Sequence, residues 1–253
     1  MKKIINDLKI EYCDEGSGPT ILFLHGWGSN KQSFNFLARK LKKEHRVVRM
    51  DLPGFGKSQI PPKNWFLDDY INLVKEFIEK LDLEIDTLIG HSFGGRIIIK
   101  GNSEKILQAN RNVLIGAEGV KTNKNKIKTK FIKKISKIGK LILLIPPFIF
   151  WKGKIRRYFY SKIGSDYMNA GEMKQIYLNI IEEDLEIHAQ KITTPTLLIW
   201  GQDDQITPIS KGRKLSRLIE NSKLKTIEDS GHFIHEDKPE EVLKSIKKFY
   251  ENT

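Results

Sequence analysis

The chain has 253 residues, of which 30% are charged and 39% hydrophobic; this suits one folded domain and excludes a largely disordered chain. The formal net charge is +13, but twelve lysines and two arginines with no acid fall in residues 121–162, so the remainder is close to neutral. The only cysteine, Cys13, excludes an internal disulfide framework and a cysteine metal cluster. Because the first residues also lack an apolar run of signal-peptide length, we expect a cytoplasmic protein.

Strands and helices are predicted to alternate along most of the chain. Short apolar or alternating runs predict strands at residues 2–5, 8–12, 20–24, 46–50, 86–89, 112–115, 196–200 and 224–227. Periods of three to four residues predict helices at 33–42, 66–81, from 95 onward, 209–219 and 239–250. This alternation predicts a mostly parallel sheet covered on both faces. Polar residues that follow its strands should gather at the carboxyl ends: His25, Asp51, Ser92, Asp204 and His232.

A candidate nucleophile lies in the pattern G-x-S-x-G at residues 90–94, between a predicted strand and a predicted helix. A serine on so tight a turn is held in a strained conformation with its hydroxyl exposed at the sheet edge. Gly90 and Gly94 are required there because strand and helix approach closely. The N–H of Phe93 should point to where an oxyanion forms during acyl transfer. A glycine-rich turn that merely contains a serine is the alternative, and the strand–turn–helix context favours the nucleophile.

A serine nucleophile needs a histidine base and a carboxylate that orients this base. His232 follows the last predicted strand, whereas His25 and His91 flank other motifs and His235 fits a surface or helix-start residue. Candidate acids are the adjacent Asp203 and Asp204 after another strand, with Glu118 as a third. The side chains of the adjacent Asp203 and Asp204 should point in different directions, so that only one of the two faces the histidine. The residues alone leave the choice of acid open.

Five stretches resemble motifs of the α/β-hydrolase superfamily, in the same order: HGWGSN at 25–30, DLPGFGKS at 51–58, GHSFGG at 90–95, WGQDDQITP at 200–208 and SGHFIHEDKPEEV at 230–242. This resemblance implies a doubly wound, mostly parallel eight-stranded α/β sheet with an inserted helical cap. It also implies the triad Ser92, Asp204 and His232, which selects Asp204 over Asp203, and oxyanion N–H groups from Trp27 and Phe93. We expect no cofactor and no metal. Substrate contacts are expected from Trp27, Phe93, Phe148 and Phe233.

Other chemistries fit less well. Gly54-Phe55-Gly56-Lys57-Ser58 ends like a phosphate-binding loop, but Asp51 stands where the first glycine is required. Gln59 likewise replaces the third glycine of a dinucleotide fingerprint. His232 and His235 are too few for a metal site. Because position 92 is serine rather than aspartate, the residues favour esters, thioesters or activated carbon–carbon bonds.

The resemblance divides the chain into a core, residues 1–117 and 193–253, and a cap, residues 118–192, which contains the basic segment. Within the cap, isoleucine and phenylalanine recur every three or four residues from 127 to 145, with lysines between them. A stripe packed over the pocket with a solvated lysine face is one interpretation. Recruitment of an acidic partner is the other: an acyl carrier protein, an anionic membrane surface or a carboxylated substrate. Similarity to pimeloyl carrier-protein methyl ester esterases supports the carrier, and nucleic acid is not expected.

The sequence therefore predicts a serine hydrolase that cleaves a carboxylic ester, a small-molecule or acyl ester, through an acyl-enzyme. One alternative is a hydrolase that cleaves a carbon–carbon bond of a vinylogous diketone, with Arg156 or Arg157 on the substrate carboxylate. Another is a non-catalytic protein that uses the pocket to sense a ligand.

Overall fold

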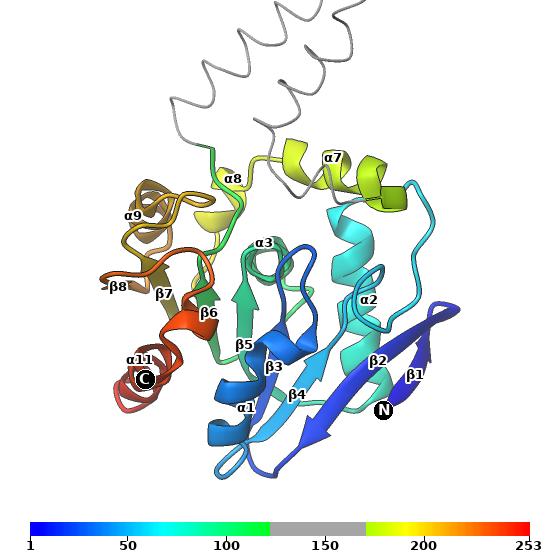
Figure 1. Ribbon diagram of the computed structural model, residues 1–253, viewed down its shortest axis with the longest axis horizontal. Coiled ribbons are helices and arrows are strands. Elements are labelled where there is room, and N and C mark those ends of the chain that lie inside the picture. The colour runs from blue at the N-terminus through cyan, green and yellow to red at the C-terminus, as the bar shows by residue number, and fades with distance from the viewer. Residues whose placement is uncertain (122–170) are drawn as a thin grey trace, which may run out of the picture.

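The computed structural model describes residues 1–121 and 171–253. At its centre lies an eight-stranded sheet in the order β1-β2-β4-β3-β5-β6-β7-β8 (Figure 1). The strands are β1 (Lys2–Ile5), β2 (Leu8–Glu15), β3 (Thr20–Leu24), β4 (Arg46–Met50), β5 (Ile85–His91), β6 (Arg111–Ile115), β7 (Thr196–Gly201) and β8 (Ser222–Ile227). Strand β2 pairs antiparallel with β1 and β4, and every later pairing is parallel. The predicted doubly wound, mostly parallel sheet is confirmed.

Each predicted helix has a described counterpart within a few residues of its expected bounds. They are α1 (Asn35–Leu41), α2 (Leu67–Lys80), α3 (Phe93–Ser103), α7 (Lys174–Glu182), α8 (Glu186–Ala189), α9 (Ile209–Leu218), α10 (Ile234–Asp237) and α11 (Pro239–Tyr250), with 3₁₀ turns η1 (Lys31–Phe34) and η3 (Gly171–Met173). Helices α7, α8 and α10 had no predicted range. The helix predicted at 33–42 is divided into η1 and α1. Helix α3 begins at Phe93 rather than at residue 95, so it starts directly after Ser92.

Two helical layers cover the sheet, one on each face (Figure 1). Along β3, Leu22 and Leu24 face a core shared with α2, α3 and α9. Ile21 and Phe23 point the other way, into a core shared with α1 and α11. Since successive side chains of a strand alternate between faces, burial of both faces makes β3 apolar throughout, as its sequence TILFL shows.

The segment predicted as the cap is described only in part. Residues 122–170 lie outside the described residues, and with them Phe148, Arg156, Arg157 and the apolar stripe at 127–145. Its described end includes α8, which packs between α3 and α9, and Leu185, Ala189 and Ile192 join the core of the sheet. The boundaries 118 and 192 remain predictions. Among the helices of residues 1–121 and 171–253, none combines the length and the apolarity needed to cross a bilayer.

The close approach of α3 to the sheet depends on glycine. Gly90 pairs in register with Leu24 on β3, and a Cβ built on Gly90 would lie 2.6 Å from the carbonyl carbon of Gly94. A Cβ on Gly94 would lie 2.0 Å from the Leu24 carbonyl oxygen. The Gly94 N–H donates to the His25 carbonyl at 3.1 Å, so the start of α3 rests directly on the end of β3.

Gly94→Ala should therefore destabilise the protein by about 2–3 kcal/mol, because the added methyl meets backbone rather than a flexible side chain. Urea unfolding at constant m-value measures the loss. Gly231→Ala is the matched control, since a Cβ there meets nothing within 4 Å, and it should cost less than about 1 kcal/mol. Equal losses at the two positions would contradict the close-packing account.

Candidate active site

Ser92 occupies the turn between β5 and α3 in a strained backbone conformation, with φ 47° and ψ −104°. A non-glycine residue at positive φ costs conformational energy, which surrounding structure must offset. Here the Ser92 N–H donates to the Ile115 carbonyl at 3.0 Å, and the Ser92 carbonyl accepts from Arg96 N–H at 3.1 Å. The serine is half-buried. The predicted strand–turn–helix setting of this residue is therefore present.

Asp204 and His232 lie side by side after β7 and β8. Asp204 Oδ2 is 2.8 Å from His232 Nδ1, and the two residues are only 3% and 7% exposed. Burial acts to raise the pKa of the Asp204 carboxyl, but hydrogen bonds from His232 and Thr207 outweigh it and the pKa falls below its usual value. Asp204 is therefore a buried carboxylate, which orients the imidazole so that Nε2 is its free nitrogen.

Thr207 completes the support of this carboxylate, and the sequence reasoning missed it. Its N–H donates to Asp204 Oδ1 at 2.7 Å, and its hydroxyl lies 2.8 Å from Asp204 Oδ2 and 3.1 Å from His232 Nδ1. The hydroxyl also reaches the Gly116 carbonyl at 3.0 Å, and the Thr207 carbonyl accepts from Trp200 Nε1 at 2.7 Å. A threonine three residues after the acid, within the turn whose N–H groups can donate to an aspartate side chain, is the signal that could have found it.

Ser92 and His232 flank the same short segment after β6. The Ser92 N–H bonds Ile115, while a Cβ built on the next residue, Gly116, would lie 3.3 Å from His232 Nδ1. Within the described part of the chain, no hydrogen bond joins the Ser92 hydroxyl to His232. Hydrogen bonds between nucleophile and base are often long in proteins without substrate and tighten when substrate binds.

The predicted oxyanion donors lie beside this serine. Phe93 is the first residue of α3, so its N–H has no partner within the helix. Trp27 lies in the loop after β3, and its ring contacts Phe93 at 5.5 Å and Phe55 at 4.8 Å between centroids. These edge-to-face contacts fix the Trp27 loop against the start of α3.

Among the described residues, the other candidate acids do not bond His232, and His25 and His235 are buried. Asp203 is exposed, and Glu118 Oε1 lies 4.0 Å from Lys211 Nζ rather than at His232. His25 Nδ1 donates to the Gly26 carbonyl and its Nε2 accepts from Leu52 N–H; burial, the main cause, lowers its pKa to about 4. His235 lies in α10 as expected for a helix-start residue, but it is buried rather than exposed. Its pKa is lowered by burial to about 3.

A buried ion pair joins the loop that follows β3 to the loop that follows β4. Lys31 Nζ is 2.8 Å from Asp51 Oδ2, and the N–H groups of Lys31 and Lys57 donate to the same carboxylate. The sequence reasoning treated DLPGFGKS only as a structural turn and missed this lysine. A Cβ on Gly56 would lie 2.3 Å from the Asp51 carboxyl carbon, so the turn needs glycine to wrap around the acid.

A cavity of about 630 Å³ opens beside Trp27 and Phe233. Phe55 and Met173 form the remainder of its apolar wall, and Asn30, Ser33 and Glu236 line its polar side. Of the residues predicted to contact substrate, Trp27 and Phe233 line this cavity, Phe93 contacts Trp27 without lining it, and Phe148 lies outside the described residues. Among the described residues, no three histidine, cysteine, aspartate or glutamate side chains group as metal ligands.

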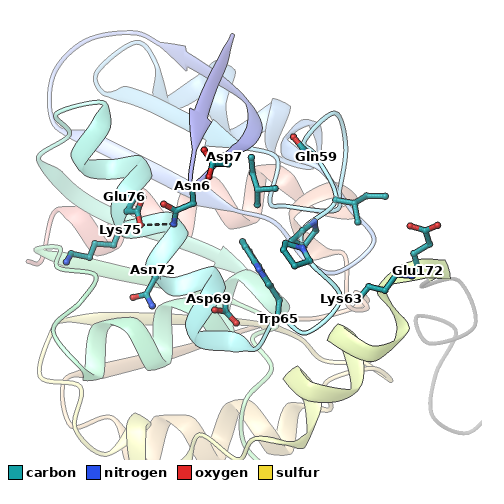
Figure 2. Close-up of a pocket in the computed structure, with 14 residues that line it drawn as sticks. Asn6, Asp7, Gln59, Lys63, Trp65, Asp69, Asn72, Lys75, Glu76 and Glu172 are labelled. Atoms are coloured by element: carbon teal, nitrogen blue, oxygen red, sulfur yellow. Dashed lines mark hydrogen bonds between the residues drawn. The ribbon is translucent and has the colours of Figure 1, made fainter.

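A larger cavity of about 880 Å³ lies away from this site, between the β1–β2 turn, the loop at 59–65 and α2 (Figure 2). Acids, amides and lysines line it together with Trp65, and Asn6 bonds Glu76 across one wall at 2.7 Å. Trp65 packs edge-on against Tyr70, and Tyr70 packs in the same way against Phe93, each at 5.0 Å. Packed rings thus connect the wall of this cavity to the candidate site.

The fold and this site together define an α/β hydrolase: a serine on a strand–turn–helix, and a buried carboxylate–histidine pair at the same sheet edge. Consistent with this, the family model described as "Alpha/beta hydrolase family" matches residues 21–245, and the chain belongs to that family.

Similar proteins include an uncharacterized hydrolase, YugF, of Bacillus subtilis, 28% identical over 94% of this chain and 92% of that protein. Another is pyrrolizixenacetamide deacetylase of Xenorhabdus hominickii, 26% identical over 98% of this chain and 97% of that protein. Among solved structures, a bacterial membrane phospholipase A is 25% identical, with a TM-score of 0.76 over 100% of this chain and 85% of that one. An esterase from Exiguobacterium antarcticum shares the fold with a TM-score of 0.75 over 98% of both chains at 24% identity.

Loss of the Asp51 charge should destabilise the protein in a pH-dependent way. Burial raises the pKa of Asp51, but the bonds from Lys31 and Lys57 lower it more, so its folded pKa lies below the unfolded value near 4. The charge therefore stabilises the fold above about pH 4, and this contribution is lost as the pH falls towards the folded pKa. Asp51→Asn should cost about 3 kcal/mol near neutral pH, and the difference should shrink below about pH 4.

Urea unfolding of both proteins across this pH range measures the difference. Glu79→Gln, in the exposed Lys75–Glu79 pair, is the control and should change stability by less than about 0.5 kcal/mol. A loss at Asp51 that stays constant as the solution is acidified would be inconsistent with a stabilising charge.

Proposed function

We propose that the protein is a serine hydrolase that cleaves carboxylic esters through an acyl-enzyme. The observation that carries this proposal is the buried Asp204–His232 pair, 2.8 Å apart, at the same sheet edge as the strained Ser92. Among the similar proteins, the names phospholipase, esterase and deacetylase all describe acyl transfer to water. Their identities to this chain are low, so they support the class of reaction and leave the substrate open.

In the first half of the proposed reaction, His232 Nε2 takes the proton of the Ser92 hydroxyl as Oγ attacks the ester carbonyl. The N–H groups of Trp27 and Phe93 donate to the oxyanion of the tetrahedral intermediate. Asp204 holds the imidazolium in place through Nδ1. When the intermediate collapses, His232 gives the proton to the leaving alkoxide, and the acyl group stays on Ser92.

In the second half, water replaces the alcohol. His232 takes a proton from the water as its oxygen attacks the acyl carbonyl, and the same two N–H groups hold the second oxyanion. Collapse returns the proton to Ser92 and releases the carboxylic acid. Apart from the ester and the water, every group that acts in these steps belongs to the chain.

The cavity beside Trp27 and Phe233 fits an apolar acyl or alcohol portion of the ester, because Trp27, one candidate oxyanion donor, forms part of its aromatic and methionine wall. The acidic partner predicted from the basic segment rests on sequence alone, since residues 122–170 are not described. A panel of p-nitrophenyl esters of increasing acyl length, run beside a vinylogous diketone with a carboxylate, separates ester hydrolysis from carbon–carbon cleavage.

Ser92→Ala should abolish the burst of p-nitrophenol from a p-nitrophenyl ester and lower kcat by at least about 10³-fold. It should also abolish covalent labelling by a fluorophosphonate, while far-UV circular dichroism stays unchanged. Ser245→Ala on α11 is the control, because in the part of the chain that the structure describes its hydroxyl bonds the Glu241 carbonyl alone. Undiminished turnover or labelling in Ser92→Ala would refute the assignment, and a wild-type protein that takes no label would favour a ligand sensor.

Asp204→Asn should lower kcat on the order of 10³–10⁴-fold, since an amide no longer orients or stabilises the His232 imidazolium. The adjacent Asp203→Asn is a matched control: this side chain is exposed, and kcat should stay within about twofold. Steady-state kinetics on one p-nitrophenyl ester measures both variants. A larger loss of kcat in Asp203→Asn than in Asp204→Asn would show that Asp204 is not the acid of the triad.

A further inference from the structure

His91, the residue before Ser92, bonds the backbone of His232 across 141 positions of sequence. It is the last residue of β5 and is 1% exposed. Its Nε2 lies 3.1 Å from the His232 carbonyl oxygen. Among the described residues, no other donor reaches that carbonyl. The side chain next to the proposed nucleophile is thus the partner that holds the backbone of the proposed base.

The chemistry of the contact fixes the tautomer of His91. A carbonyl oxygen can only accept, so Nε2 must carry the hydrogen and donate it. Nδ1 is buried without a partner among the described residues and faces Gly26, where an added Cβ would lie 2.7 Å away. Burial, together with the neighbouring His235 and His232, holds the pKa of His91 well below its usual value. His91 therefore remains a neutral Nε2–H donor at neutral pH.

The ring of His91 also packs under the loop that carries His232. Its centroid lies 4.7 Å from that of His232, 5.6 Å from that of Phe233 and 4.3 Å from that of His235. The ring thus contacts three of four successive side chains and bonds the main chain of the first of them. On its other side the ring lies against Gly26, where any side chain would collide with it.

We propose that His91 is a positioning residue that sets where the His232 imidazole stands relative to Ser92 and Asp204. The inference rests on the proposed function of Ser92 and His232. His91 and Ser92 are consecutive, so the bond from His91 to residue 232 ties the base loop to the strand that ends in the nucleophile. Without this bond, the loop that carries His232 loses a hydrogen-bonded link to β5.

Two variants distinguish the role of the His91 hydrogen-bond donor from the role of the size of its side chain. His91→Gln has an amide that reaches about as far as Nε2 and can still donate, whereas His91→Met has similar length and no donor. We expect His91→Met to lower kcat about 10- to 100-fold with KM within about twofold, because small displacements of a reacting group cost this much. His91→Gln should stay within about threefold of wild type. Rates are normalised to sites titrated by a fluorophosphonate, and thermal unfolding reports on the fold. If His91→Met does not fold, His91→Asn, whose amide stops short of the carbonyl, replaces it with the same expected loss.

Proton NMR gives a readout that needs no reactivity at Ser92, so it remains valid if the proposed function fails. The downfield Nδ1–H resonance of His232 hydrogen-bonded to Asp204 should persist in His91→Gln and broaden or disappear in the variant without a donor. In the wild type, ¹⁵N shifts should show His91 neutral with its hydrogen on Nε2 between about pH 6 and 8. Equal rates in the Gln and Met variants, an unchanged His232 resonance in the latter, or a hydrogen on Nδ1 of His91 would each overturn the proposal.

Discussion

The contact of the start of α3 with the ends of β3 and β5 is the constraint on which the rest of the site depends. Gly90 and Gly94 leave no room for a side chain there, and the Gly94 N–H is bonded to the His25 carbonyl. Ser92 is thereby forced to positive φ, and its strain is offset by the backbone bonds around it. The same contact puts the N–H of Phe93 beside the loop of Trp27. One steric condition therefore locates both the candidate nucleophile and its candidate oxyanion donors.

A second constraint is the need to keep the Asp204 carboxylate ionised although it is almost completely buried. Asp204 is 3% exposed and would be costly there without partners. It accepts from His232 Nδ1, from the Thr207 hydroxyl and from the N–H groups of Ile206 and Thr207. These donors come mostly from its own turn, so the carboxylate is held whether or not the imidazole is present. This arrangement lets the acid orient His232 instead of following it.

Much of this architecture could be predicted from the sequence, because apolar runs such as TILFL and the order of the motifs leave local signals. The sheet and most helix bounds followed from them. What could not be predicted are contacts between polar residues far apart in the chain. The Lys31–Asp51 pair, the bond from His91 to residue 232 and the burial of His235 depend on how loops meet in three dimensions. No periodicity records such contacts. Thr207 is intermediate, because it lies within a motif that was recognised, yet its role appears only when Gly116 is placed next to it.

The three histidines around His232 share one electrostatic property. His25, His91 and His235 are all buried, and burial lowers the pKa of each, to about 4 for His25 and about 3 for His235. They therefore serve as neutral donors, acceptors and packed rings. A cation at His91 or His235 would repel a positive charge on His232, since like charges at such separations disfavour each other. Only His232 has a carboxylate 2.8 Å away. His232 thus lies between neutral histidine rings on one side and a buried carboxylate on the other.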